Sequence, residues 1–290
     1  MPGRCRVGYW GTCHAASGSP ASSRARCCSP AARERGRRRI RPPARWGARR
    51  RAPRRRPPRC PPRPRRRPPV EEPLTGFVVA VDPGHNGGNA AHPAEVTAPV
   101  PDGRGGIKAC NTTGTASATD YPEHAFNWEV AAAVRERLED LGAEVVLSRE
   151  DDEGVGPCVD ERGQFAGDAG ADVLVSIHAN GTEDTSAAGF HMIVVEDSPH
   201  AGVAEPSRTL AEDMVEAFGA ADLAPNPAYG DDGIVARTDI AGLNHAKVPA
   251  VLVECGEMRN PDEAALMESA AGRERYAAAI VAGVQEFLED

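Results

Sequence analysis

Residues 71–290 alternate between short apolar runs and longer segments whose apolar positions recur at helical spacing. This alternation is typical of an α/β domain, in which buried strands are continuously apolar and helices are apolar on one face. The apolar, mostly β-branched runs predict strands over 77–81, 143–147, 172–177, 189–195, 233–236 and 248–254. The helical spacing predicts helices over 122–141, 159–169, 207–218, 261–269 and 272–288, and the glycine-rich stretch 86–120 predicts a long surface loop.

The first 70 residues have a different composition. They contain 22 arginines, no lysine and one acidic residue, Glu34, which gives a net charge of about +21. Residues 71–290 hold the other 12 basic and 41 acidic residues, about −29, so that the whole chain has a net charge of −8. A segment with so few aliphatic side chains cannot bury enough surface to offset its ordering entropy. We therefore predict that residues 1–72 are a disordered Arg/Pro-rich tail and that residues 75–290 form one domain.

Two interpretations of this tail are open. Its arginine runs are suited to binding nucleic acid, anionic lipid or an anionic wall polymer through counterion release. Alternatively, residues 1–70 come from an extended start in GC-rich DNA, because Arg, Pro, Ala and Gly have GC-rich codons. The chain has no run approaching the roughly 18 apolar residues of a membrane span. Residues 1–70 also lack the apolar core, about 7–15 residues long, of a signal peptide.

Two histidines follow predicted strands directly. His85 ends the sequence Val-Asp-Pro-Gly-His, and His178 lies in Val-Ser-Ile-His-Ala-Asn. In open α/β sheets ligand sites lie outside the carboxyl ends of the strands, so two imidazoles placed there could converge on one metal ion. Four further histidines of the domain are interpreted as surface or loop residues: His92, His191, His200 and His245.

A metal site needs a third protein ligand, and the start of the helix predicted after 122 offers two. Glu123 and His124 are adjacent there, and spacing does not choose between them. Glu254 ends a strongly apolar strand, where a partly desolvated carboxylate has a raised pKa and can exchange protons near neutral pH. Two histidines, one carboxylate and an open position are the ligand set of a catalytic zinc site.

These motifs together resemble the zinc-dependent N-acetylmuramoyl-L-alanine amidases of the Amidase_3 family. The resemblance covers residues 76–289 and rests on five ordered markers: Val-Asp-Pro-Gly-His85-Asn-Gly-Gly, Glu123 with Asn127, Leu-Ser-Arg149, Ser-Ile-His178-Ala-Asn and Pro-Ala-Val-Leu-Val-Glu254-Cys-Gly. Further details are similar to the short, single-domain secreted members: Gly-Arg-Gly-Gly before Cys110, Gly-Pro-Cys158-Val-Asp-Glu-Arg, and Arg237-Thr-Asp-Ile-Ala-Gly-Leu-Asn. Asn86 departs from the pattern, since many members have glycine there.

The resemblance implies a fold, a site and a reaction. The fold is an α/β domain with a mixed sheet of about six strands flanked by helices. His85, Glu123 and His178 bind one zinc ion, which decides between Glu123 and His124, and Glu254 is the catalytic carboxylate. The substrate is peptidoglycan or its muropeptides, hydrolysed at the amide between the lactyl group of N-acetylmuramic acid and L-alanine. We expect Asp82 and Asn180, which flank the ligands, to orient them.

The resemblance also implies a disulfide between Cys110 and Cys158, as in the short secreted members. A structural disulfide requires an oxidising compartment, so a secreted, periplasmic or cell-wall location follows. Cys255, next to Glu254, is interpreted as a buried small residue. We expect a monomer.

Three other functions compete with this one. The same metal set could serve another zinc peptidase or deacylase, or the chain could be a non-catalytic peptidoglycan-binding module. The full ligand set together with Glu254 argues against the second of these. A third interpretation makes the tail a nucleic-acid binder, whereas the acidic domain by itself should repel nucleic acid.

Overall fold

The computed structural model describes residues 72–230 and 232–290. The predicted disorder of the tail and both of its interpretations lie outside these residues and stay predictions. Within the described part, no helix is long and apolar enough to cross a membrane.

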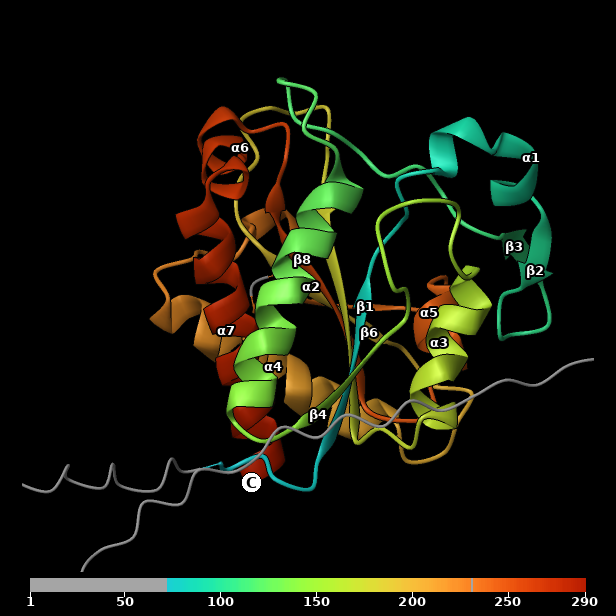
Figure 1. Cartoon of the computed structure of the whole chain (residues 1–290), viewed down its shortest axis with the longest axis vertical. Helices are drawn as coiled ribbons and strands as arrows, with labels where there is room; N and C mark the ends of the chain where they lie inside the picture. The colour runs from blue at the N-terminus through green and yellow to red at the C-terminus, as the bar shows by residue number, and fades with distance from the viewer. Residues whose placement is uncertain (1–71, 231) are drawn as a thin grey trace, which may run out of the picture. The chain divides into compact units, whose positions relative to one another are not determined.

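A six-stranded mixed sheet forms the centre of the domain (Figure 1), as expected. Its strands are β1 (Val78–Pro83), β4 (Glu144–Leu147), β5 (Val173–Asn180), β6 (His191–Val195), β7 (Ile234–Arg237) and β8 (Ala250–Glu257), in the spatial order β4-β1-β5-β8-β6-β7. Neighbouring strands are parallel except for β6 and β8, which are antiparallel. The carboxyl ends of β1, β5 and β8 therefore lie at one edge of the sheet.

Helices cover both faces of the sheet. One layer consists of α2 (Glu123–Asp140), α4 (Ala204–Ala220) and α7 (Ala270–Glu289), with α6 (Pro261–Glu268) beside it, and the other of α3 (Val159–Asp168) and α5 (Ala241–His245). The side chains of β5 point alternately toward the two helix layers. Val173, Val175 and Ile177 join the core under α2, α4 and α7, whereas Leu174 joins the smaller core under α3 and α5. Because side chains alternate in a strand, Ser176 and His178 face the α3–α5 side.

The predicted loop 86–120 contains structure that its composition hides. It holds a short 3-10 helix η1 (Asn89–Ala91), a helical turn α1 (Pro93–Val96) and a hairpin of β2 (Pro99–Pro101) and β3 (Ile107–Ala109). These elements are only three or four residues long, too short for a period to appear in the sequence. Another 3-10 turn, η2 (Pro227–Tyr229), precedes β7.

Three predicted strand ends fall two or three residues short, and the first is that of β1, which continues to Pro83. The structure continues β5 to Asn180 and β8 to Glu257, so His178 and Glu254 lie within their strands, before the strand ends. The polar residues that close these strands pair with one another across the sheet, since Asn180 and Glu257 are register partners and Asn180 donates to the Glu257 carboxylate at 2.8 Å. In a sequence, polar residues at such positions predict that the strand has ended. Here they stay within the sheet because each satisfies the other across the two strands.

Candidate functional site

His85 occupies the turn that follows β1 and has a positive φ of 58°. Its Nδ1 lies 3.1 Å from the carbonyl oxygen of Thr112, and its Nε2 lies 3.2 Å from Glu123 Oε1. An imidazole that donates from Nδ1 to a carbonyl keeps the lone pair of Nε2 free. The Thr112 contact therefore favours the tautomer in which Nε2 can bind a cation.

His178 comes from β5 and meets the same carboxylate. Its Nδ1 lies 2.9 Å from Glu123 Oε1, and the His85 and His178 rings stand edge to face with centroids 4.8 Å apart. The His178 ring lies against Gly84, where an added Cβ would come within 2.1 Å of the ring carbon Cε1. Gly84 thus leaves room for the imidazole beside the β1 turn.

Glu123 is the first residue of α2 and is buried between the two imidazoles. Its Oε2 accepts a hydrogen bond from the Thr115 amide at 2.9 Å. Burial by itself would raise the pKa of the Glu123 carboxyl, but the charge of His85 and hydrogen bonds from both histidines hold that pKa well below its usual value. Glu123 is therefore an anion at the centre of the cluster.

One nitrogen from each histidine and one Glu123 oxygen lie within 4.8 Å of one another, and this group is a candidate metal site. Two imidazole nitrogens and a carboxylate oxygen are donors that zinc accepts in catalytic sites, so the donor set fits this ion. His124 lies outside the group: its Nδ1 is 2.7 Å from Asp152 Oδ2. Adjacent positions on a helix point about 100° apart, so only one of the two residues can face the cluster.

Glu254 stands beside the candidate metal site. It is the register partner of His178 on the neighbouring strand, and it lines the same cleft of about 390 Å³ as His85, Glu123 and His178. Its Oε2 is buried and has no hydrogen-bond partner among the described residues. Burial, followed by the nearby charges of Glu123 and Glu257, raises the pKa of Glu254 well above its usual value. Such a carboxyl has high proton affinity.

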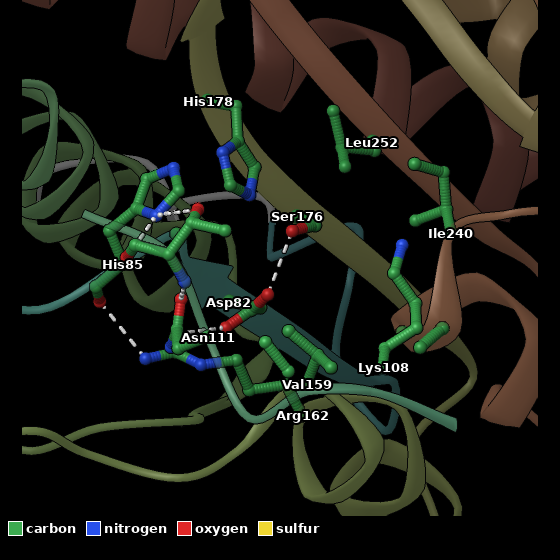
Figure 2. Close-up of a pocket in the computed structure, with 15 residues that line it drawn as sticks. Asp82, His85, Lys108, Asn111, Val159, Arg162, Ser176, His178, Ile240 and Leu252 are labelled. Atoms are coloured by element: carbon green, nitrogen blue, oxygen red, sulfur yellow. Dashed lines mark hydrogen bonds and ion pairs between the residues drawn. The ribbon is translucent and has the colours of Figure 1, made fainter. Parts of the chain in front are cut away.

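A second cavity of about 210 Å³ adjoins this cleft (Figure 2). The two share His85, Thr112, His178, Ile240 and Leu252. Much of the remaining lining is apolar. Among its charged side chains, Asp82 accepts hydrogen bonds from Ser176 at 2.7 Å and from Arg162 at 2.7 Å. The cleft and the cavity therefore both border His85 and His178.

The structure changes the interpretation of three other residues. His191, predicted at the surface, is buried in β6 and stacks on Tyr229 with ring centroids 3.9 Å apart. Asp82 and Asn180 were expected to orient the ligands, but no hydrogen bond joins either of them to the three cluster side chains. Asn180 donates to the Tyr229 hydroxyl and to Glu257. Asp82 accepts from Ser148, Ser176 and Arg162.

Cys110 and Cys158 form the expected disulfide, and Cys255 is a buried free thiol. The disulfide joins the segment leading to Thr112 with the residue that precedes α3. Sequence reasoning assigned no role to Arg162 or to Arg149 (of Leu-Ser-Arg), although both stood in quoted motifs. Both are buried next to the β1 turn.

Comparisons with known proteins agree on one family. The model of the family described as N-acetylmuramoyl-L-alanine amidase, Amidase_3, matches residues 79–286. The chain is 44% identical over 215 residues to the N-acetylmuramoyl-L-alanine amidase Rv3717 of Mycobacterium tuberculosis, covering 74% of this chain and 88% of that protein. Among solved structures it is similar to the amidase Ami1 of Mycobacterium smegmatis, with a TM-score of 0.71, 43% identity and coverage of 74% and 98%. It is also similar to the apo form of Ami1 from Mycobacterium abscessus, with a TM-score of 0.71, 40% identity and coverage of 74% and 100%.

Proposed function

The chain belongs to the Amidase_3 family of N-acetylmuramoyl-L-alanine amidases, and on this premise we propose that His85, Glu123 and His178 bind a catalytic zinc ion while Glu254 moves the proton. The bond hydrolysed is the amide between the lactyl group of N-acetylmuramic acid and L-alanine in peptidoglycan. The observation that carries the site assignment is the convergence of three donors within 4.8 Å, beside a carboxyl whose buried Oε2 has no hydrogen-bond partner in the part of the chain that the structure describes.

When bound, zinc supplies Lewis acidity that polarises a carbonyl and lowers the pKa of water. Glu254 accepts a proton from the attacking water, so that a new C–O bond forms at the lactyl carbonyl carbon. Glu254 then returns this proton to the nitrogen as the C–N bond breaks, and L-alanine leaves as an amine. General acid–base help of this kind is worth about 10²- to 10⁴-fold in rate.

The environment of Glu254 suits this task. Its buried oxygen and the neighbouring carboxylates Glu123 and Glu257 disfavour a lasting negative charge, which raises its proton affinity. The full donor set with Glu254 also favours an enzyme over a non-catalytic binding module.

The location and the assembly state belong to the same proposal. The Cys110–Cys158 disulfide is stable in an oxidising compartment, and the substrate is a wall polymer. We place the enzyme outside the cytoplasm, at the cell wall, acting as a monomer.

The test uses purified full-length protein and muropeptides. Mass spectrometry should find newly freed L-alanine amino termini and newly freed lactyl carboxyls, with product formation lost on chelation and regained with zinc. His178→Ala should lose zinc by elemental analysis, whereas His92→Ala, an exposed histidine that binds Glu95, should keep it. An uncut lactyl–alanine bond, with cleavage elsewhere in the peptide, would show the chain to be another zinc peptidase.

A further inference from the structure

The turn that presents His85 has an unusual backbone. His85 is one of four non-glycine residues in the described part of the chain with a positive φ, at 58°. L-residues rarely adopt this left-handed conformation, and it persists only where surrounding contacts impose it. The hydrogen bond to the Thr112 carbonyl is made by the imidazole of His85 and not by its main chain. Other groups must therefore hold the backbone.

Arg162 of α3 supplies several of those contacts, in addition to the 3.0 Å main-chain bond from the Gly84 amide to Ile177 O. Its guanidinium is buried against the turn (Figure 2) and reaches main-chain carbonyls on both sides of Gly84. It donates to five acceptors at 2.9 Å or less: Pro157 O at 2.9 Å, Asp82 Oδ1 at 2.7 Å, Pro83 O at 2.8 Å, His85 O at 2.9 Å and Asn86 Oδ1 at 2.5 Å. A sixth, longer contact joins Nη1 to Ser148 Oγ at 3.5 Å. An arginine side chain has five N–H donors, so each of them is used.

Asp82 fixes this guanidinium in turn. Its Oδ1 pairs with Arg162, and its Oδ2 accepts from Ser176 on β5. The carboxylate therefore cannot rotate without losing a bond, and the guanidinium plane is held relative to the sheet. Arg149, which follows β4, also donates to this turn, through a 2.9 Å bond to Pro83 O. Pro83 O thus accepts from two buried arginines.

We infer that Arg162 is a positioning residue for the metal ligand His85, acting through the main chain of the Pro83–Asn86 turn. This inference rests on the proposed function, because it takes His85 to be a ligand. Positioning is needed since the two histidines and Glu123 come from three separate elements, and only a fixed turn keeps His85 Nε2 facing Glu123. Groups that orient metal ligands in this way are typically worth about 10- to 100-fold in metal affinity.

Lysine cannot replace Arg162 in this role. An ammonium keeps the positive charge but has three donors and no planar fork, so at least two of the five acceptors lose their bond. Charge alone predicts no change in zinc affinity for Arg162→Lys. Geometry predicts weaker binding, and this difference separates positioning from electrostatics.

The experiment measures the zinc dissociation constant of the full chain by competition with a chromophoric chelator. Arg162→Lys should raise it about 10- to 100-fold, while the metal-free variant keeps its circular dichroism spectrum. The matched control is Arg275→Lys, because Arg275 also donates to a main-chain carbonyl, that of Ala221, but contacts no residue of the site. Its zinc affinity should equal that of the parent.

The measured zinc affinities distinguish a failure of the positioning role from a failure of the proposed function. An Arg162→Lys protein that folds and binds zinc like the parent overturns the positioning role and leaves the zinc site intact. A parent protein that binds no zinc overturns the proposed function itself. If Arg162→Lys does not fold, Asn86→Ala replaces it, since it removes the acceptor next to His85 and otherwise one 3.1 Å bond from Asn86 Nδ2 to Glu153 O. Weaker zinc binding by Asn86→Ala then supports the role, and unchanged binding contradicts it.

Discussion

His178 and Glu254 are register partners on the adjacent parallel strands β5 and β8. Their side chains lie on the same face of the sheet, the face covered by α3 and α5, and both line the cleft. A candidate metal ligand and the carboxyl proposed to move the proton are thus both held by strands of the central sheet. Strands place such groups more exactly than loops do, because the ladder of main-chain hydrogen bonds limits their movement.

Glu254→Gln should keep zinc bound and lose activity. The amide has nearly the same shape as the carboxyl but cannot accept the water proton, so kcat should fall about 10²- to 10⁴-fold. Muropeptide turnover and zinc content, measured on the same sample, check this. Glu183→Gln, at an exposed carboxylate, should leave both unchanged. Loss of zinc in Glu254→Gln would instead make Glu254 a ligand.

Gly84→Ala should displace His178, the proposed metal ligand on β5. A Cβ at this position would approach the His178 ring to 2.1 Å, and the ring cannot move away without leaving Glu123. We expect zinc affinity to fall by at least about 10-fold. Gly219→Ala is the control, because no atom lies within 4 Å of its added Cβ and it sits in α4. That variant should be as stable as the parent or more so, by up to about 1 kcal/mol. Normal zinc binding by Gly84→Ala would contradict the close packing.

The Cys110→Ser/Cys158→Ser double variant should be less stable and should bind zinc more weakly. The bond closes a loop with a sequence separation of 48, for which loop entropy gives a contribution of about 4 kcal/mol at most. It also joins the segment of Thr112 to α3, which carries Arg162, and both hold His85. Denaturant unfolding and chelator competition measure the two effects. Reductant should lower the unfolding free energy and the zinc affinity of the parent and leave those of the double variant unchanged. Equal changes in both proteins would mean that the reductant acts on something other than this disulfide.

Acid should destabilise the fold through His191. Burial, followed by the charge of Arg237, lowers the pKa of His191 to about 4 from the usual 6.5. The unfolded chain therefore binds a proton between these values while the folded chain does not, so stability falls as pH decreases through this window. Between pH 7 and pH 5 this one group should cost about 2 kcal/mol.

His191→Gln tests this contribution. Urea unfolding of the metal-free protein at pH 7 and pH 5 should show a loss of stability smaller than that of the parent by about 2 kcal/mol. His92→Gln, at an exposed histidine, should behave like the parent. A variant with the same pH dependence as the parent would mean that His191 titrates normally in the folded protein.

Short-range patterns in the sequence were enough to predict the strands, the long helices and the two motifs that carry His85 and His178. Strand alternation and helical periodicity depend on neighbouring residues, so they are visible in the chain itself. The family resemblance added the mixed sheet and the Cys110–Cys158 pair, both of which the structure contains.

What the tertiary structure decided depends on contacts between distant segments. On residue spacing alone Glu123 and His124 were equivalent, and the resemblance favoured Glu123 without a physical reason. The packing of α2 against β1 and β5 supplies that reason, because it turns Glu123 toward the histidines and His124 toward Asp152. The burial of His191 required Tyr229 to stack on it, and the role of Arg162 required the β1 turn to lie against α3. Such contacts follow from strand order and register, which are set by the summed packing of the whole domain, and no local pattern of residues encodes them.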